Sequence, residues 1–394
     1  MKRLSRFLPV AAACLLVACS LVACATDAAT DAATAVPSER VAAPELPPPL
    51  ARMLSDRPAP PIDAMEVWVC DVPAGATAAV YGGLTLREPL TADGIVAAIG
   101  ERLHTYVGTV SGGRTDLRLV AGGTVTMGVD DDDDACAEAS LARSSGEADV
   151  VLAVATAQHD LGQPGGRGRP GSSLTCTESC SAAATGRAIV IGANDFHDSW
   201  GEVPLLDLIE HEYGHTLGLP HSGTEQPGDD EYISAIDLMS NSAAPRDVHP
   251  DRRDGPLPLA IDLVDVGWLA LDQVVVPRAG AETIDVELTP TSDPRESSGP
   301  RLLVLPVDEH RMVSVEFRVP VGLDDHLPEA GVAVHRIDDR AGGGVLRVQV
   351  PLHTDVVPFT DLLGAGDVLE RDGWRIEVRA VGATAHLAIT PTDG

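Results

Sequence analysis

The first two thirds of the chain contain short apolar runs that are typical of buried strands. The first begins at Met65–Val69, and the second is Leu117–Met127. Asp149–Thr156 and Arg187–Ile191 follow, and both are rich in the β-branched residues that favour strands. We therefore predict a sheet built from these four runs.

Helical spacing occurs between the strand-like runs and after them. In Thr91–Val110, apolar residues recur every three or four positions, and Thr91 is a suitable N-cap. Strands that alternate with helices predict an α/β domain, which we place at residues 63–272. Two further helices are predicted at Ala135–Arg143 and Pro204–Leu217.

Two other segments of the chain have different patterns. Gly162–Ser181 is rich in Gly, Ser and Pro and predicts a long loop. From about Val274 the chain changes to short strands separated by turns, which predicts an all-β, sandwich-like domain at residues 273–394. The strands expected there are Leu302–Val307, Met312–Val319, Val332–Ile337, Val345–Val350, Trp374–Val378 and Ala385–Ile389.

The N-terminus has the pattern of an export signal. Three basic residues precede the apolar run Phe7–Ala18, which is shorter than the roughly 20 residues that a membrane span needs. The tetrapeptide Leu-Val-Ala-Cys then ends at Cys19 and again at Cys24, and it resembles the lipobox of bacterial lipoproteins. We predict a signal at residues 1–24 with Cys19 and Cys24 as lipidation candidates. An ordinary signal peptide, cut after Ala25, is the alternative.

Residues 25–62 are rich in Ala, Thr, Asp and Pro, and Pro47–Pro49 are consecutive. A segment of this composition cannot bury a core, so we predict a flexible tether that holds the folded part away from a membrane surface.

Composition narrows the range of partners. The formal net charge is -31, whereas nucleic-acid binding needs basic patches, so no nucleic acid is expected. Aromatic residues make up only 3% of the chain, so the cores must be built from Val, Leu, Ile and Ala.

Four cysteines follow the signal: Cys70, Cys136, Cys176 and Cys180. An even number in an exported chain suggests two disulfides, and four cysteines allow three pairings. A local bridge between Cys176 and Cys180 is plausible, but the pairing stays open. Their spacing fits no structural zinc pattern.

Residues 211–221 read His-Glu-Tyr-Gly-His-Thr-Leu-Gly-Leu-Pro-His. His211 and His215 are four apart, so on a helix their imidazoles face a common point. Gly218 tolerates the left-handed conformation by which the chain leaves a helix, and the turn then delivers His221 as a third ligand. Three protein nitrogens leave one position of a tetrahedral zinc ion open, which is typical of catalytic sites.

Glu212 lies next to His211, where it can reach a water on the metal. Zinc lowers the pKa of its water to about 7, and Glu212 would take the proton as the water attacks a peptide carbonyl. Glu212 would then pass that proton to the leaving amine. The motif therefore predicts an endopeptidase with one catalytic zinc ion.

This eleven-residue pattern resembles that of the metzincins, a family of zinc peptidases. The resemblance implies a mixed sheet with an active-site helix, followed by a tight turn that carries a methionine beneath the zinc. Asp237–Ser240 matches that turn, so Met239 is the implied Met-turn residue. Within the metzincins, the chain is most similar to the gametolysin-like and immune-inhibitor-A-like bacterial peptidases.

That closer similarity has specific grounds and one departure. Val266–Leu269 resembles the end of their catalytic domain, and Val313–Arg318 with Gly331–Asp338 resembles their β-rich extension. Some metzincins carry a Tyr two residues after the methionine as a ligand or oxyanion donor, but Asn241 stands there in this chain. Tyr232 is a candidate for that donor role.

Three hypotheses follow for function. The first is a zinc endopeptidase acting on extracytoplasmic proteins, lipid-anchored to the bacterial envelope or secreted. The alternative is a surface lipoprotein whose β domain binds a partner or glycan while the metal site is vestigial. A third possibility is zinc-dependent hydrolysis of a non-peptide amide. A calcium site at Asp130–Asp134 is the weaker interpretation of that acidic run, since five consecutive Asp cannot all face one ion, and we expect a solvated loop.

Overall fold

Residues 44–394 of the chain form one compact unit in the computed structural model. The signal with Cys19 and Cys24, most of the predicted tether, and Cys176 and Cys180 lie outside the residues that the structure describes. Those described residues are 46–54, 59–73, 90–146, 148–156, 166–171, 186–192, 206–225, 231–278, 282–292, 299–340, 345–352 and 360–392.

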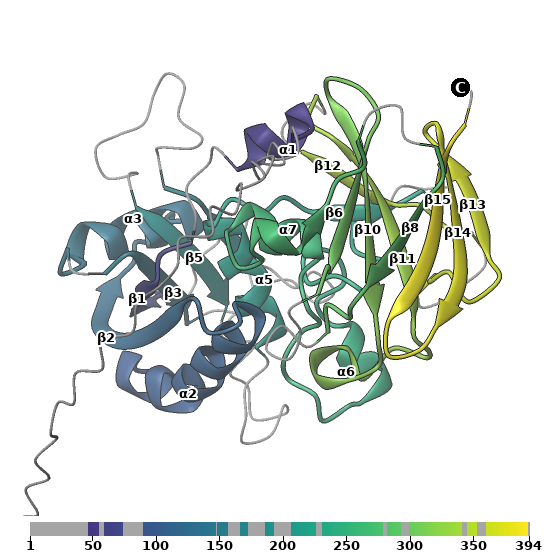
Figure 1. The fold of residues 1–394 in the computed structure, drawn as a ribbon. Coiled ribbons are helices and arrows are strands. Elements are labelled where there is room, and N and C mark those ends of the chain that lie inside the picture. The colour runs from purple at the N-terminus through teal and green to yellow at the C-terminus, as the bar shows by residue number, and fades with distance from the viewer. Residues whose placement is uncertain are drawn as a thin grey trace, which may run out of the picture. The chain divides into compact units, whose positions relative to one another are not determined.

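A five-stranded sheet organises the first half of the unit (Figure 1). Its neighbouring strands are parallel except for the antiparallel pair β4–β5 at one edge. The four strand-like runs predicted from the sequence all belong to this sheet. In spatial order its strands are β2 (Asp116–Thr126), β1 (Ile62–Asp71), β3 (Val150–Ala155), β5 (Arg187–Gly192) and β4 (Gly166–Arg169).

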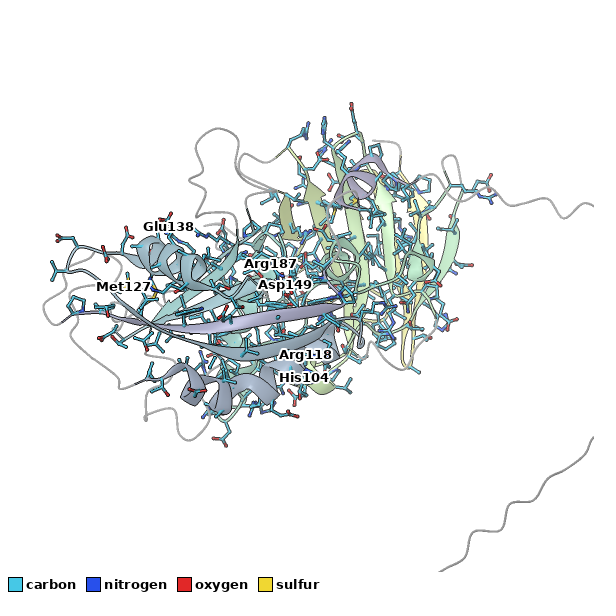
Figure 2. All side chains as sticks on the ribbon, turned by 90° about the vertical axis from the view of Figure 1, so that its left-hand side faces the viewer. His104, Arg118, Met127, Glu138, Asp149 and Arg187 are labelled. Atoms are coloured by element: carbon cyan, nitrogen blue, oxygen red, sulfur yellow. A yellow bond between two sulfur atoms is a disulfide. The ribbon has the colours of Figure 1, made fainter. Side chains whose placement is uncertain are left out.

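Helices cover both faces of this sheet. The long helix α2 (Ala92–Val110) packs through Leu103 on the face that carries Met65, whereas α3 (Asp133–Arg143) packs on the face that carries Trp68. Figure 2 shows the two helices on opposite sides of the strands. The predicted N-cap of α2 is confirmed, because the Thr91 hydroxyl accepts from Gly94 N at 3.1 Å. The prediction that the first half has an α/β architecture is therefore confirmed.

The acidic run forms the start of α3. Asp132 is the N-cap and accepts a hydrogen bond from Ala135 N at 3.0 Å. Asp133 and Asp134 lie in the first turn, where the helix dipole favours negative charge. Arg167 of β4 reaches Asp134 at 3.0 Å. The expected solvated loop was therefore wrong for Asp133 and Asp134, which are helical, whereas Asp132 is exposed and outside the helix.

The end of the predicted tether is folded. Helix α1 (Pro48–Met53) buries Leu50 and Met53 completely or nearly so in the main core. Arg52 at its surface pairs with Asp339 from the C-terminal half. The tether prediction is therefore wrong for residues 46–54. Proline is well tolerated in the first turn of a helix, and two apolar residues three apart suffice to dock a single turn.

Two sheets of the C-terminal half face each other across an apolar core, as predicted for a β-rich, sandwich-like part. Four of their strands, β6, β7, β8 and β13, were not among those predicted. The six-stranded sheet has the order β6 (Ser222–Thr224), β12 (Leu346–Gln349), β11 (Gly331–Asp338), β10 (Arg311–Arg318), β9 (Leu302–Pro306) and β7 (Val274–Val275). The four-stranded sheet has the order β13 (Val368–Arg371), β14 (Trp374–Val381), β15 (Ala385–Pro391) and β8 (Ile284–Leu288).

The outer face of the six-stranded sheet is buried against the first half of the chain. Along β10, Val313 and Val315 join the sandwich core, whereas the alternate residues Glu316 and Arg318 bond to residues 258–260. Strand β6 belongs to the first half by sequence but to the C-terminal sheet by structure, because it pairs with β12 in parallel register. The predicted boundary at 272 therefore does not separate the two sheets completely. The two halves therefore share structure, although the change in sequence pattern near Val274 does mark where the β-rich part begins.

Cys70 on β1 and Cys136 on α3 form a disulfide. Disulfides persist in oxidising compartments, which agrees with an exported chain. Within the described residues, no helix combines the length and apolarity that a membrane crossing requires.

Replacement of both Cys70 and Cys136 with Ala is expected to lower the free energy of unfolding by about 4 kcal/mol. The bridge closes a loop of 66 residues, and its loss restores the conformational freedom of that loop in the unfolded chain. Urea unfolding followed by circular dichroism would measure the difference. Reduced wild-type protein should show the same loss, and equal stability of wild type and variant would contradict the prediction.

Candidate metal centre

Helix α5 (Asp207–Thr216) carries the first part of the candidate site and is anchored to the sheet by buried polar contacts. The hydroxyl of Tyr213 donates to Asp63 of β1 at 2.6 Å, and Arg187 of β5 donates to the same carboxylate at 2.9 Å. Arg187 also donates to the Thr216 carbonyl at the C-terminal end of α5. These bonds fix both the position and the rotation of the helix.

The chain leaves α5 at the predicted glycine. Gly218 has a φ of 92°, the left-handed conformation that glycine adopts without strain. Gly218 N donates to the His215 carbonyl at 2.9 Å, and Leu219 N donates to the Gly214 carbonyl at 3.1 Å. The exit turn carries the chain to His221, directly before β6.

Three imidazoles converge at this point. His215 Nε2 lies 3.1 Å from His211 Nε2 and 2.9 Å from His221 Nε2. Among the described residues, these three histidines are the one group of His, Cys, Asp or Glu side chains with the mutual distances of metal ligands. The structure thus brings together the three predicted ligands.

The opposite nitrogen of each ring has an oxygen partner. His211 Nδ1 lies 2.7 Å from the Leu238 carbonyl, and His215 Nδ1 lies 2.8 Å from the Leu219 carbonyl. His221 Nδ1 lies 3.0 Å from the Glu231 carboxylate. Carbonyl oxygens only accept hydrogen bonds, so Nδ1 is the donor in the first two rings and their Nε2 lone pairs are free.

Burial keeps two of the rings neutral. Burial, together with the neighbouring histidines, lowers the pKa of His211 to about 3 and that of His215 to about 4. Neutral imidazole is the form that binds metal.

The donor set fits a zinc ion. In a tetrahedral site, nitrogens about 2.0–2.1 Å from the metal lie roughly 3.3 Å from one another, close to the observed separations. The Nε2 lone pairs of His211 and His215 point at each other with no proton to share, so a cation held between them and His221 would satisfy both. The oxygen partners on Nδ1 are the usual outer contacts of metal-binding histidines.

Met239 lies directly below the ligand helix. It is fully buried in a turn closed by the bond from Ser240 N to the Asp237 carbonyl, 3.1 Å long. A side-chain carbon added to Gly214 would come 2.5 Å from the Met239 sulfur, so the methionine packs against α5 between the two helical ligands. The same turn supplies the Leu238 carbonyl that holds His211.

Glu212 is buried beneath β4. The carboxylate accepts a hydrogen bond from Gly168 N. Burial raises the pKa of Glu212 to about 7, although the Gly168 bond and Arg167 oppose the shift. A side-chain carbon at Gly168 would fall 2.0 Å from the Glu212 carbonyl oxygen, so the strand can lie this close to α5 only with glycine there.

Tyr232 lies beside the third ligand. Its hydroxyl is 3.4 Å from His221 Nε2, and its side chain is half exposed. Asn241, which stands where some metzincins have their tyrosine, donates its backbone N–H to the Ser234 carbonyl.

Sequence reasoning missed two parts of the site. Glu231 was not singled out, although it follows the third ligand by ten residues and contacts it. Strand β4 falls within the predicted loop Gly162–Ser181, which was wrong for residues 166–169. Its Gly-Arg-Gly-Arg sequence has no apolar alternation, and the useful signal was the pair of glycines, which permits close approach to another backbone.

No family model and no curated protein matches this chain. The interpretation of the site therefore depends on its own residues and geometry.

Proposed function

We propose that this chain is a zinc-dependent endopeptidase of the metzincin type that cleaves extracytoplasmic proteins or peptides. The supporting observation is the convergence of three Nε2 atoms, at 2.9 and 3.1 Å, beside a buried glutamate. The wider resemblance adds to it, since the glycine exit and the buried Met239 turn occupy the positions that the metzincin pattern implies.

The chain's own groups suit peptide-bond hydrolysis. Bound zinc would supply a Lewis acid that polarises the scissile carbonyl and acidifies water. Glu212 would accept the proton of the attacking water and return it to the leaving amine. The Gly168 N–H holds one carboxylate oxygen and leaves the other to carry the proton. Burial raises the pKa of Glu212, which favours the protonated form that the group must hold between the two steps.

Location follows from the N-terminal pattern. We propose that the chain is exported and either lipid-anchored through Cys19 or Cys24 or secreted. The Cys70–Cys136 disulfide supports an oxidising compartment. The competing function is that of a binding protein with a vestigial metal site. That hypothesis predicts that the protein binds zinc but hydrolyses no peptide bond.

The function is tested by metal analysis and protease assay of the same preparation. We expect close to one zinc per chain, cleavage of casein or gelatin, loss of cleavage on chelation and recovery on adding zinc. His215→Ala should lose both zinc and activity, because two imidazoles bind the ion far more weakly than three.

His326→Ala is the matched control for that substitution. His326 is also buried, with its Nε2 2.7 Å from the Ala235 carbonyl, but it lies outside the ligand cluster. This variant should retain zinc. Stoichiometric zinc in His215→Ala, or a zinc-loaded wild type that cleaves no peptide bond in a broad peptide mixture, would contradict the proposal.

A further inference from the structure

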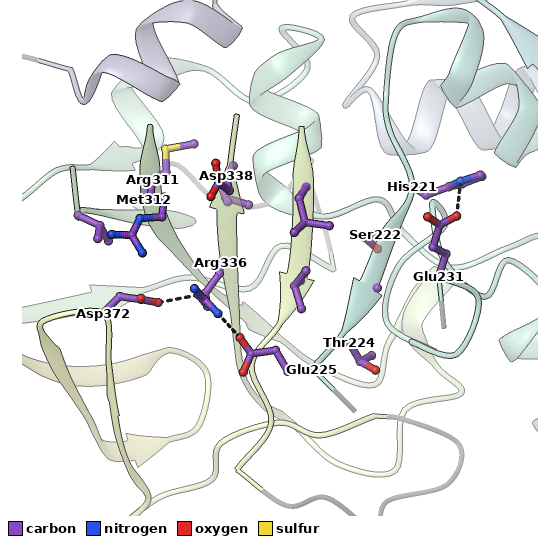
Figure 3. Close-up of a pocket in the computed structure, with 15 residues that line it drawn as sticks. His221, Ser222, Thr224, Glu225, Glu231, Arg311, Met312, Arg336, Asp338 and Asp372 are labelled. Carbon is purple, nitrogen blue, oxygen red and sulfur yellow. Dashed lines mark hydrogen bonds and ion pairs between the residues drawn. The ribbon is translucent and has the colours of Figure 1, made fainter. Parts of the chain in front are cut away.

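A cavity of about 300 Å³ opens beside the third histidine, on the face of the six-stranded sheet that bears Arg336 (Figure 3). It begins at His221 and Glu231, passes β6, and extends over β12 and β11 to β10. The C-terminal half of the chain therefore builds most of this cavity.

The charged side chains that line the cavity are paired with groups of the protein. Arg336 contacts Glu225 at 2.5 Å and Asp372 at 2.8 Å, as Figure 3 shows. Arg311 and Asp338 pair with Asp308 and Arg340, respectively, which lie outside the lining. A charged guest would have to compete with these pairs, so the cavity offers no strong selection for charge.

The remaining lining is apolar. Leu346 and Val348 of β12 both line the cavity, and Leu346 is 48% exposed. Val307 adds a further apolar side chain, whereas Met312 and Ile337 border the cavity but are buried in the main core. Ligand pockets start at about this volume and are lined mainly by apolar side chains, so the cavity has room for a large apolar side chain.

The cavity adjoins the candidate metal centre at His221. Glu231 lines it and also contacts Nδ1 of His221, the ring nitrogen opposite the one that faces the other histidines. The cavity therefore lies behind His221 as seen from the ligand cluster. A group that occupies it is separated from the reacting carbonyl by the His221 ring.

We infer that this cavity is a substrate subsite that receives a large apolar side chain, such as Leu, Met or Phe, at least one residue away from the scissile bond. This inference depends on the proposed peptidase function and deepens it. It makes the C-terminal sheet a determinant of cleavage preference through Leu346 and Val348.

Cleavage-site profiling of the zinc-loaded full chain tests the subsite. Digestion of a random peptide mixture, read by mass spectrometry, should show one position, not adjacent to the cut, that is enriched in large apolar residues. For a peptide with Leu at that position, Leu346→Glu should lower kcat/KM about tenfold or more, because the guest loses an apolar contact and meets a charge. The same peptide with Gly there should be cleaved equally by both proteins.

Leu271→Glu is the matched control. Leu271 is 46% exposed in the short 3₁₀ segment Leu271–Gln273 and does not line the cavity, so this variant should keep the wild-type profile. No positional preference, a preference for acidic or basic residues, or an unchanged profile in Leu346→Glu would overturn the subsite while leaving the peptidase intact.

A binding measurement separates the two proposals. Dye-labelled Leu and Gly peptides are titrated into Glu212→Gln and into Glu212→Gln with Leu346→Glu, with fluorescence anisotropy as the readout. Glu212→Gln should bind the Leu peptide about tenfold more tightly than the Gly peptide. The double variant should bind both peptides equally. Equal binding of both peptides would overturn the subsite whether or not wild type hydrolyses peptides. Leu-dependent binding without any wild-type hydrolysis would overturn the peptidase and retain the cavity as a peptide-binding site.

Discussion

Replacement of Glu212 with Gln is expected to lower the rate of peptide hydrolysis by about 10²–10⁴-fold while zinc remains bound. The amide keeps the shape of the side chain and can still accept the Gly168 hydrogen bond, but it has no basic oxygen to take a proton from water. The three histidines are unchanged, so metal content should equal that of wild type.

Hydrolysis of a fluorogenic peptide and zinc content by atomic emission would be measured on the same samples. Glu101→Gln, an exposed change on α2, should keep full activity and full zinc. If Glu212→Gln hydrolysed peptide at nearly the wild-type rate, the role of Glu212 in moving the proton would be wrong.

Replacement of Arg318 with Met is expected to lower the free energy of unfolding by about 3–5 kcal/mol. Arg318 is completely buried and lies 2.9 Å from both Glu316 and Asp324. Burial alone would lower its pKa, but the two carboxylates raise it above the usual value, so the group stays charged. Without it, two buried carboxylates lose their only shared cation, and the Pro258 carbonyl loses a donor.

Denaturant unfolding of Arg318→Met beside Arg118→Met would test this expectation. Arg118 pairs with Asp116 at the surface, where solvent screens the pair, so its loss should leave the unfolding midpoint unchanged. Adding Glu316→Gln and Asp324→Asn to Arg318→Met should recover part of the stability, because neutral amides need no counter-charge. Equal midpoints for the two single variants would show that the buried pair contributes nothing.

The predicted ligands could be placed from sequence because their geometry is local. Four residues on a helix and one glycine bend bring His211, His215 and His221 together without reference to the rest of the chain. Four of the five strands of the α/β sheet were also predictable, since each contains an apolar run, whereas β4 has none. Periodicity and turn chemistry act over ten residues or fewer.

What the sequence did not reveal depends on contacts between distant segments. Glu231 contacts His221 because the chain folds back between them. Gly168 donates a hydrogen bond to Glu212, which lies 44 positions later. The polar alternation of β10, with Glu316 and Arg318 buried, looks like a solvent-facing edge until the opposite half is placed on it. Helix α1 was missed because a six-residue helix that begins with prolines is too short to show a helical repeat of apolar residues.

Strand β6 links the metal centre to the end of the chain. His221 precedes it immediately, and its partner β12 is formed by Leu346–Gln349, more than a hundred residues later. During synthesis the two helical ligands can therefore be in position long before the third has a strand to support it. If the proposed peptidase activity is right, a chain that lacks β12 would have no folded support for its third ligand and should not cleave.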